Sequence, residues 1–207
     1  MPVARGEKTY IKKLQRKQVD LMQWWGHHRD PLFDSYNFPI MNEREREFWY
    51  QKKKHSFSRR CFAVYNLEDR FVGNISLRNI RWLKRTSELG IVFDPNYINK
   101  GYGTDSLKTF IKYYFETMKM KELKLKVALF NERAEKCYQK CGFHFKEIEY
   151  DYFEDQDFKI YRWDKLMDYQ NYFKFENNIL FCKYKSMYIT REMAMKSDLV
   201  TNPATEG

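Results

Sequence analysis

Between residues 88 and 118 of this 207-residue chain, an apolar run, a glycine-containing turn and an amphipathic segment follow one another. Residues 89–93 are apolar and rich in β-forming residues, and Asp94 and Pro95 end the run, which indicates a buried strand. After the turn, apolar residues recur at helical spacing and so share one helix face: Leu107, Phe110, Ile111, Tyr114, Phe115 and Met118. The order strand, turn, helix is the strongest constraint on the fold.

The turn carries glycines at 101 and 103, directly before the predicted helix. The first backbone N–H groups of a helix lack a partner inside it, and the helix dipole adds positive charge there. Glycine also removes the Cβ atoms that would hold a ligand away, so the turn can bind phosphate oxygens. An ordinary turn in which glycine serves only the backbone is the alternative. Ser106 occupies the place of a third glycine and no Gly-Lys-Ser/Thr sequence follows, which argues against a Rossmann dehydrogenase and a P-loop nucleoside triphosphatase.

A second strand-and-helix block begins at residue 123. Leucine and valine alternate with lysine and alanine over residues 123–129, which predicts a strand. Asn131 follows as an N-cap, Cys137, Tyr138 and Cys141 lie on one helical face, and Gly142 ends the helix. The spacing of Cys137 and Cys141, one helical turn, suits packing better than a disulfide or zinc site.

Together the two blocks resemble the GCN5-related N-acetyltransferase (GNAT) superfamily over residues 10–168. The family's phosphate motif, Gln/Arg-x-x-Gly-x-Gly/Ala, is matched at residues 98–103, except that Ile98 stands where Gln or Arg is usual. Its second signature, Asn-x-x-Ala-x-x-x-Tyr-x-x-x-Gly-Phe, is matched from Asn131 to Phe143. The layout is closest to the branch of ribosomal-protein alanine and spermidine acetyltransferases. The resemblance implies an α/β (α+β) GNAT fold, with a mixed, mostly antiparallel sheet of six to seven strands and helices on both faces.

The resemblance also implies a site. Tyr138 matches the tyrosine that acts as general acid near the CoA sulfur, and Asn131 the residue that binds pantetheine or orders water. Glu88 matches a glutamate that takes the amine proton. A tyrosine packed in the core and a solvated strand-end carboxylate are the structural alternatives for Tyr138 and Glu88. Acetyl-CoA, without a metal, is expected at Ile91, Val92, Phe93, Asn99, Lys100, Gly101, Tyr102, Gly103, Thr104 and Asn131.

The sequence patterns also predict how the chain is divided into segments. We expect a flexible tail at 1–9, the acetyltransferase domain at 10–168, and at 169–207 a C-terminal extension, partly docked and frayed at its end. Within the domain, strands are predicted at 71–79, with Phe71 and Ile75 on one face, at 143–152 and at 158–163, and a helix capped by Asn42. Tyr36, Phe38 and Trp49 are candidates for the wall of the acceptor pocket, although simple packing also explains them.

The distribution of charge does not decide between the two classes of acceptor. The net charge of +10 favours an anionic partner such as a ribosome-associated protein substrate. A cluster of acidic residues favours instead a polyamine or amino-sugar: Glu147, Glu149, Asp151, Glu154, Asp155 and Asp157. The chain has no apolar run long enough to cross a membrane, and its cysteines suit reduced thiols, so we expect a cytoplasmic protein without a membrane partner. A homodimer is a possible assembly.

The sequence therefore predicts a transferase, an acetyl-CoA-dependent N-acetyltransferase that acts on a primary amine by direct attack in a ternary complex. The acceptor is a small polyamine or amino-sugar, or a protein N-terminus. Two alternatives remain: a non-catalytic acyl-CoA-binding module, and a basic nucleic-acid-binding protein. The sequence contains no recognisable nucleic-acid-binding motif to support the second alternative.

Overall fold

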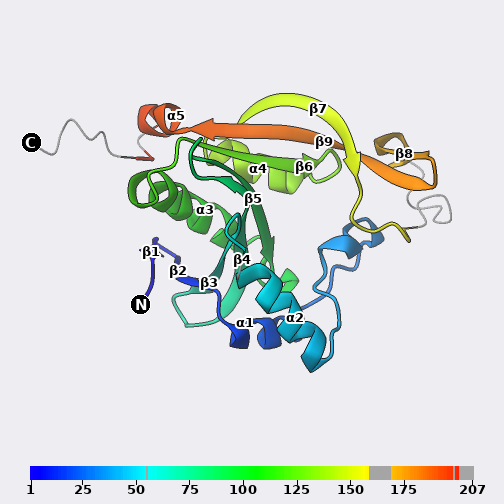
Figure 1. Cartoon of the computed structure of the whole chain (residues 1–207), viewed down its shortest axis with the longest axis horizontal. Helices are drawn as coiled ribbons and strands as arrows, with labels where there is room; N and C mark the ends of the chain where they lie inside the picture. Colours follow the sequence, from blue (N-terminus) through cyan, green and yellow to red (C-terminus); the bar gives the residue numbers. More distant parts are fainter. Residues whose placement is uncertain (55, 159–168, 198, 201–207) are drawn as a thin grey trace, which may run out of the picture.

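A computed structural model describes residues 1–54, 56–158, 169–197 and 199–200, and within these ranges it shows one nine-stranded sheet with helices on both faces (Figure 1). The strand order is β1-β2-β3-β4-β5-β6-β9-β7, with β8 paired to β9. Every neighbouring pair is antiparallel except β5 and β6. The predicted fold class is confirmed, but the expected six to seven strands are too few. The strands are β1 (Ala4–Arg5), β2 (Thr9–Lys13), β3 (Arg60–Asn66), β4 (Phe71–Arg81), β5 (Thr86–Phe93), β6 (Glu122–Ala128), β7 (His144–Tyr152), β8 (Phe173–Glu176) and β9 (Ile179–Thr190).

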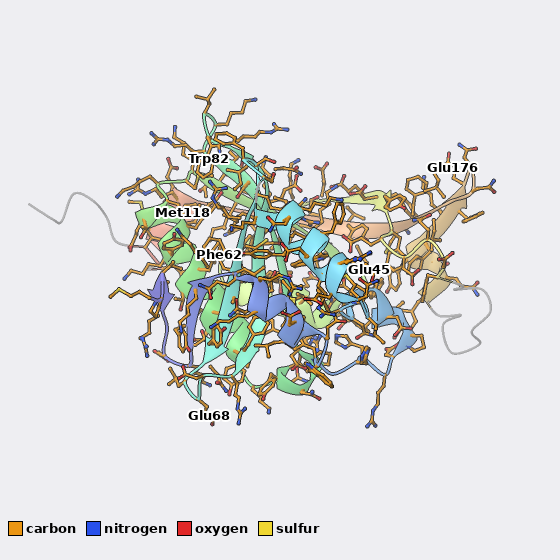
Figure 2. The ribbon with its side chains drawn as sticks, turned by 60° about the horizontal axis from the view of Figure 1, so that its bottom comes forward. Glu45, Phe62, Glu68, Trp82, Met118 and Glu176 are labelled. Carbon is orange, nitrogen blue, oxygen red and sulfur yellow. The ribbon has the colours of Figure 1, made fainter. Side chains whose placement is uncertain are left out.

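The helices cover opposite faces of this sheet (Figure 1). In β3, Phe62 packs edge-on against Phe110 of α3 with ring centroids 5.2 Å apart, and Figure 2 places Phe62 near the centre of the molecule. Ala63, the next residue, belongs instead to the cluster that α1 forms on the other face. The helical segments are α1 (Arg16–Met22), η1 (Pro31–Tyr36), α2 (Glu43–Lys54), η2 (Pro95–Tyr97), α3 (Tyr102–Lys112), which the π-helical turn η3 (Tyr113–Thr117) continues, α4 (Glu132–Lys140) and α5 (Arg191–Lys196).

Two predicted helix starts are confirmed in atomic detail. The Asn42 side chain accepts a hydrogen bond from the Glu45 amide (3.0 Å), and the Glu45 carboxylate accepts one from the Asn42 amide (2.7 Å). This capping box satisfies donors that α2 leaves unpaired. Asn131 caps α4 in the same way, because its side-chain oxygen accepts from the Ala134 amide (3.2 Å).

The only parallel contact between described strands, β5 with β6, is short. It covers three positions, ending with the pair formed by Glu88 and Lys124. Beyond Glu88, β5 continues to pair with β4 on one side, while β6 pairs with β9. No described strand pairs with the other edge of β5 over residues 89–93, which we call the open end. The two strands therefore diverge and leave backbone groups of the open end unpaired.

The chain termini are more closely integrated than their sequences suggest. Residues 169–207, expected as an extension outside the domain, contribute β8, β9 and α5, and β9 lies between β6 and β7. The pairing joins segments far apart along the chain, which local patterns do not reveal. The strand predicted at 158–163 falls almost wholly outside the described residues. At the other end, β1 pairs with β2, and Glu7 and Lys8 donate backbone hydrogen bonds to Asp105 in α3, so part of the expected tail is docked.

Candidate active site

A cleft of about 540 Å³ lies where β5 and β6 diverge. The open end of β5 forms one wall, and Lys126 and Val127 of β6 lie on the other side. Residues of the turn before α3, of α4, η1 and α2, and of strands β4, β7 and β9 also contribute to the lining. The predicted acceptor-wall residues Tyr36, Phe38 and Trp49 all line this cleft. Elements widely separated in the sequence thus meet around the unpaired edge of one strand.

The glycine-containing turn has the geometry of a phosphate site. Gly101 is left-handed, with φ of 82°, and directly precedes α3. The amide of Asp105 makes the first helical bond, to Gly101, so the amides of residues 102–104 precede the hydrogen-bonded ladder. A Cβ atom placed on Gly103 would lie 3.7 Å from the Phe93 ring and 3.8 Å from the Cys137 sulfur. A Cβ at this position would thus meet protein side chains at ordinary contact distances, and the free amides of residues 102–104 can receive a phosphate.

The predicted coenzyme residues divide into two groups. Ile91, Val92 and Phe93, together with Gly101, Gly103, Thr104 and Asn131, line the cleft, as does Ile98. Three others do not: Asn99 adopts a left-handed backbone with φ of 61°, the Lys100 ammonium lies 4.9 Å over the Tyr97 ring, and the Tyr102 hydroxyl accepts from Asn66. For these three, only the backbone is placed to contribute.

A cation near the turn was missed by sequence reasoning. The Lys8 ammonium lies 3.2 Å from the Cβ position of Gly101, at the N-terminus of α3. Because residues 1–9 were expected to be a loose tail, no pattern linked Lys8 to residue 101. The open edge of β5, the free amides after Gly101 and this cation fit a ligand such as CoA, which carries a phosphate group at one end and an amide-rich arm.

Tyr138 faces the cleft from α4. Burial raises the pKa of its hydroxyl, and the neighbouring Tyr36 and Cys137 raise that pKa further, so the phenol is protonated at neutral pH. Burial also raises the pKa of Tyr36, while a hydrogen bond from Asn131 opposes that rise. The structure thus brings Tyr36, Asn131 and Tyr138 together. Because the Asn131 oxygen already caps α4, its amide nitrogen is the part that faces Tyr36.

Glu88 lies beside the cleft and does not line it. Its carboxylate accepts a hydrogen bond from Asn79 (3.0 Å) and lines a second hollow next to the cleft. Arg78, Leu89, Lys126 and Asp151 line both spaces, so the two adjoin. Any role of Glu88 at the reacting amine requires an intervening group such as water.

Two further residues line the cleft without a motif to mark them. Burial lowers the pKa of His28, and Arg133 lowers it further, so this imidazole tends to be neutral. A hydrogen bond with Cys141 lowers the pKa of the Cys137 thiol, against the effect of burial. The signal for Cys137 was its place next to Tyr138 and one turn before Cys141. The sequence contains no comparable signal for His28.

Four of the six carboxylates in the acidic cluster form ion pairs. The Lys126 ammonium lies 2.7 Å from the Asp151 carboxylate and 3.3 Å from that of Glu149. Glu147 pairs with Lys146 at 2.5 Å. Glu147, Glu149 and Asp151 are therefore all ion-paired, although Lys126 neutralises only one of the two carboxylates that it contacts. Over the described ranges no group of histidine, cysteine or acidic side chains is arranged to hold a metal, and no helix has the length and apolarity needed to cross a membrane.

Comparisons with known proteins agree with this geometry. A family model described as an acetyltransferase (GNAT) domain matches residues 10–144. The spermidine N(1)-acetyltransferase of Vibrio cholerae is 26% identical over 139 residues, 67% of this chain and 74% of that protein. The acetyltransferase PseH of Campylobacter jejuni is 28% identical over 146 residues, covering 70% and 85%. A crystal structure of the Vibrio cholerae spermidine enzyme with CoA and spermine aligns with a TM-score of 0.68 at 21% identity, covering 90% of this chain and 98% of that one, and shows the same fold.

Proposed function

The chain belongs to the GNAT acetyltransferase family, and from this premise we propose that it transfers an acetyl group from acetyl-CoA to a primary amine. The observation that carries the proposal is the open end of β5, which runs from the glycine turn to the cleft wall facing Tyr138. The backbone of residues 91–93 would pair with the pantetheine arm as an added strand does. The amides after Gly101 would hold the pyrophosphate.

In this proposal the reaction is a direct displacement in a ternary complex. The amine nitrogen forms the new C–N bond while the C–S bond of the thioester breaks. Tyr138 donates its proton to the departing thiolate, which its protonated state allows. The amide of Asn131 contacts Tyr36 and so stabilises the wall that Tyr36 and Tyr138 share. The open-end backbone aligns the acetyl carbonyl, which supplies the proximity that such a transfer needs.

We propose that Glu88 is the general base and accepts the proton of the attacking amine through a water molecule. The hollow that holds Glu88 adjoins the cleft, and both are lined by Leu89. Replacing Glu88 with Gln keeps the hydrogen bond to Asn79 in a modified form but removes the base. We expect kcat to fall about 10²-fold or more, the usual contribution of a general base. An unchanged kcat would remove Glu88 from the mechanism.

Thiol release from acetyl-CoA in the presence of an amine panel tests the proposed function. The family relatives include a spermidine acetyltransferase, so spermidine belongs in the panel beside amino-sugars, amino acids and peptides with a free N-terminus. Turnover with any of them supports the enzyme. Binding of acetyl-CoA without turnover would favour the second candidate, a non-catalytic binding module, against which the placement of Tyr138 in the cleft speaks. Since all four cysteines are free, we also propose a reducing compartment such as the cytoplasm.

A further inference from the structure

Four cationic side chains of the described residues line the cleft, and we call two of them, Lys53 and Arg78, the cation pair. Lys53 lies in the last turn of α2 and Arg78 in β4. The Cβ position of Gly90, in the open end of β5, lies 3.8 Å from the Arg78 Nε atom and 3.9 Å from its guanidinium carbon. The pair therefore lies beside the stretch of β5 along which a thioester would run, at the α2 side of the sheet.

Arg78 is poorly neutralised. Its nearest described carboxylate, Glu154, is 3.8 Å away, and the Glu154 side chain is 76% exposed. The Nε atom of Arg78 is buried and has no hydrogen-bond partner among the described residues. The Arg78 side chain as a whole is 40% exposed, so the outer nitrogens of its guanidinium are accessible to a ligand oxygen.

Lys53 is in a similar position. Its ammonium lies 4.9 Å over the Trp49 ring, and over the described ranges it makes no ion pair. Burial lowers the pKa of Lys53, and the positive charges of Arg59 and Arg78 lower that pKa further. The positive charge of Arg78 thus disfavours the charged form of Lys53. An anion bound between the two side chains would reduce this repulsion.

The nearby carboxylates are already engaged elsewhere. Asp151 pairs with Lys126, and Glu88, opposite Arg78 in the β4–β5 register, lines the adjoining hollow instead of the cleft. Among the described side chains, four cations but only two carboxylates, Asp151 and Glu154, line the cleft itself. An acceptor with several positive charges would meet net repulsion here. An acceptor with an anionic group would instead find both a bidentate arginine donor and a lysine.

We propose that the amine acceptor carries a negatively charged carboxylate or phosphate group near its amine, and that Lys53 and Arg78 bind this group. This inference rests on the proposed function, because the bound anion belongs to an amine acceptor only if the protein transfers acetyl groups. It separates this chain from polyamine acetylation, the activity in the name of the Vibrio cholerae relative.

Calorimetric titration of the protein saturated with CoA tests the site without knowledge of the true acceptor. Saturation with CoA fills the phosphate turn, so that inorganic pyrophosphate reports on the rest of the cleft, and the variants show whether the cation pair binds it. We expect pyrophosphate to bind, and Lys53→Gln and Arg78→Gln each to weaken its binding about tenfold or more, because each removes one charge-assisted contact. Lys52→Gln is the matched control, since Lys52 is exposed on the same helix and does not line the cleft. Binding that is absent, unaffected by the two variants, or weaker than that of spermidine would overturn the inference.

Turnover with matched acceptors distinguishes the two anionic sources. Glucosamine 6-phosphate is compared with glucosamine, and glycylglycine with glycylglycine amide. We expect the anionic member of at least one pair to have a kcat/KM at least about tenfold higher, and Lys53→Gln to abolish that advantage by raising KM without lowering kcat. Equal or better turnover of both neutral members, or of spermidine, overturns the inference and leaves the acetyltransferase proposal intact. Failure to bind acetyl-CoA would overturn the proposed function instead, whatever the outcome of the charge comparison.

Discussion

The two ends of β5 differ in what lies beside them. Residues 86–88 have β4 on one side and β6 on the other, whereas residues 89–93 have only β4. At the paired end, Ser87 is 3% exposed and its hydroxyl is 2.9 Å from that of Tyr114, which donates to the Glu122 carbonyl at 2.7 Å. At the open end the strand lines the cleft. One strand thus provides stability at one end and a binding edge at the other, and changes at the two ends should have separable effects.

The largest expected effect concerns catalysis at the open end. Tyr138→Phe removes the hydroxyl that faces the cleft but keeps the ring that packs against Phe143. We expect kcat to fall about 10²- to 10⁴-fold, the usual range for loss of a general acid. The dissociation constant for acetyl-CoA and the melting temperature should stay near those of the unmodified protein. A Tyr138→Phe enzyme with full kcat would show that the proton comes from elsewhere.

The next effect concerns binding at the phosphate turn. Gly101 has a left-handed backbone, and a Cβ there would lie 3.2 Å from the Lys8 ammonium, so Gly101→Ala strains the turn and displaces this cation. We expect acetyl-CoA to bind about tenfold more weakly, as for loss of a charge-assisted contact. Gly103→Ala is the matched control, because a Cβ there makes only ordinary contacts, at 3.7 and 3.8 Å, and the family motif accepts alanine at this position. Calorimetry measures the affinities, and thermal melting reports the stability of both variants. Equal affinity of Gly101→Ala and the unmodified protein would mean that the phosphate does not lie at this turn.

A change at the paired end of β5 should lower stability and leave acetyl-CoA binding unchanged. Tyr114→Phe leaves the Glu122 carbonyl and the Ser87 hydroxyl without a partner, at a cost of about 1–3 kcal/mol. For a chain of this size the melting temperature should fall by about 2–4 °C per kcal/mol. The KM for acetyl-CoA should not change. Tyr150→Phe, on an exposed side chain, is the control and should melt like the unmodified protein. A loss of affinity in Tyr114→Phe would show that the two ends of β5 are not separable.

The smallest effect is a pH dependence at the cleft. Because burial lowers the folded-state pKa of His28, the unfolded chain binds more protons between that pKa and the ordinary value of 6.5. The contribution of His28 to stability is therefore present above pH 6.5 and is lost as pH falls through the folded-state pKa. Denaturant titrations across this pH range should show that the free energy of unfolding falls less in His28→Gln than in the unmodified protein. His144→Gln, an exposed histidine, should keep the full loss.

Local patterns predicted much of this molecule. The capping residues Asn42 and Asn131, the strand at 89–93 and the helix after the glycine turn all depend on neighbours within a few positions, and each is confirmed. The helix begins at Tyr102, so Gly103, expected before it, lies in its first turn. The cleft positions of Gly101 and Tyr138, which follow from two motifs, are confirmed as well. Their catalytic and binding roles stay predictions.

What the patterns missed depends on long-range pairing. In β4 an irregular register opposite Val64 and Tyr65 places Phe71 against Trp25, on the opposite face from Ile75, although strict alternation puts both on one face. The position of β9 within the sheet depends on pairing with β6, about sixty residues earlier. The cation pair likewise joins α2 to β4. Only the folded chain shows that the charges of Lys53 and Arg78 act on each other.

Residue-resolved amide hydrogen exchange, with and without acetyl-CoA, tests most directly the claim that the open end of β5 is the coenzyme edge. We expect acetyl-CoA to slow exchange at alternate amides of residues 89–93 and at residues 102–104, where backbone donors gain a partner. Residues 86–88 already have strands on both sides and should be unaffected. Protection of both ends alike, or of neither, would contradict the account.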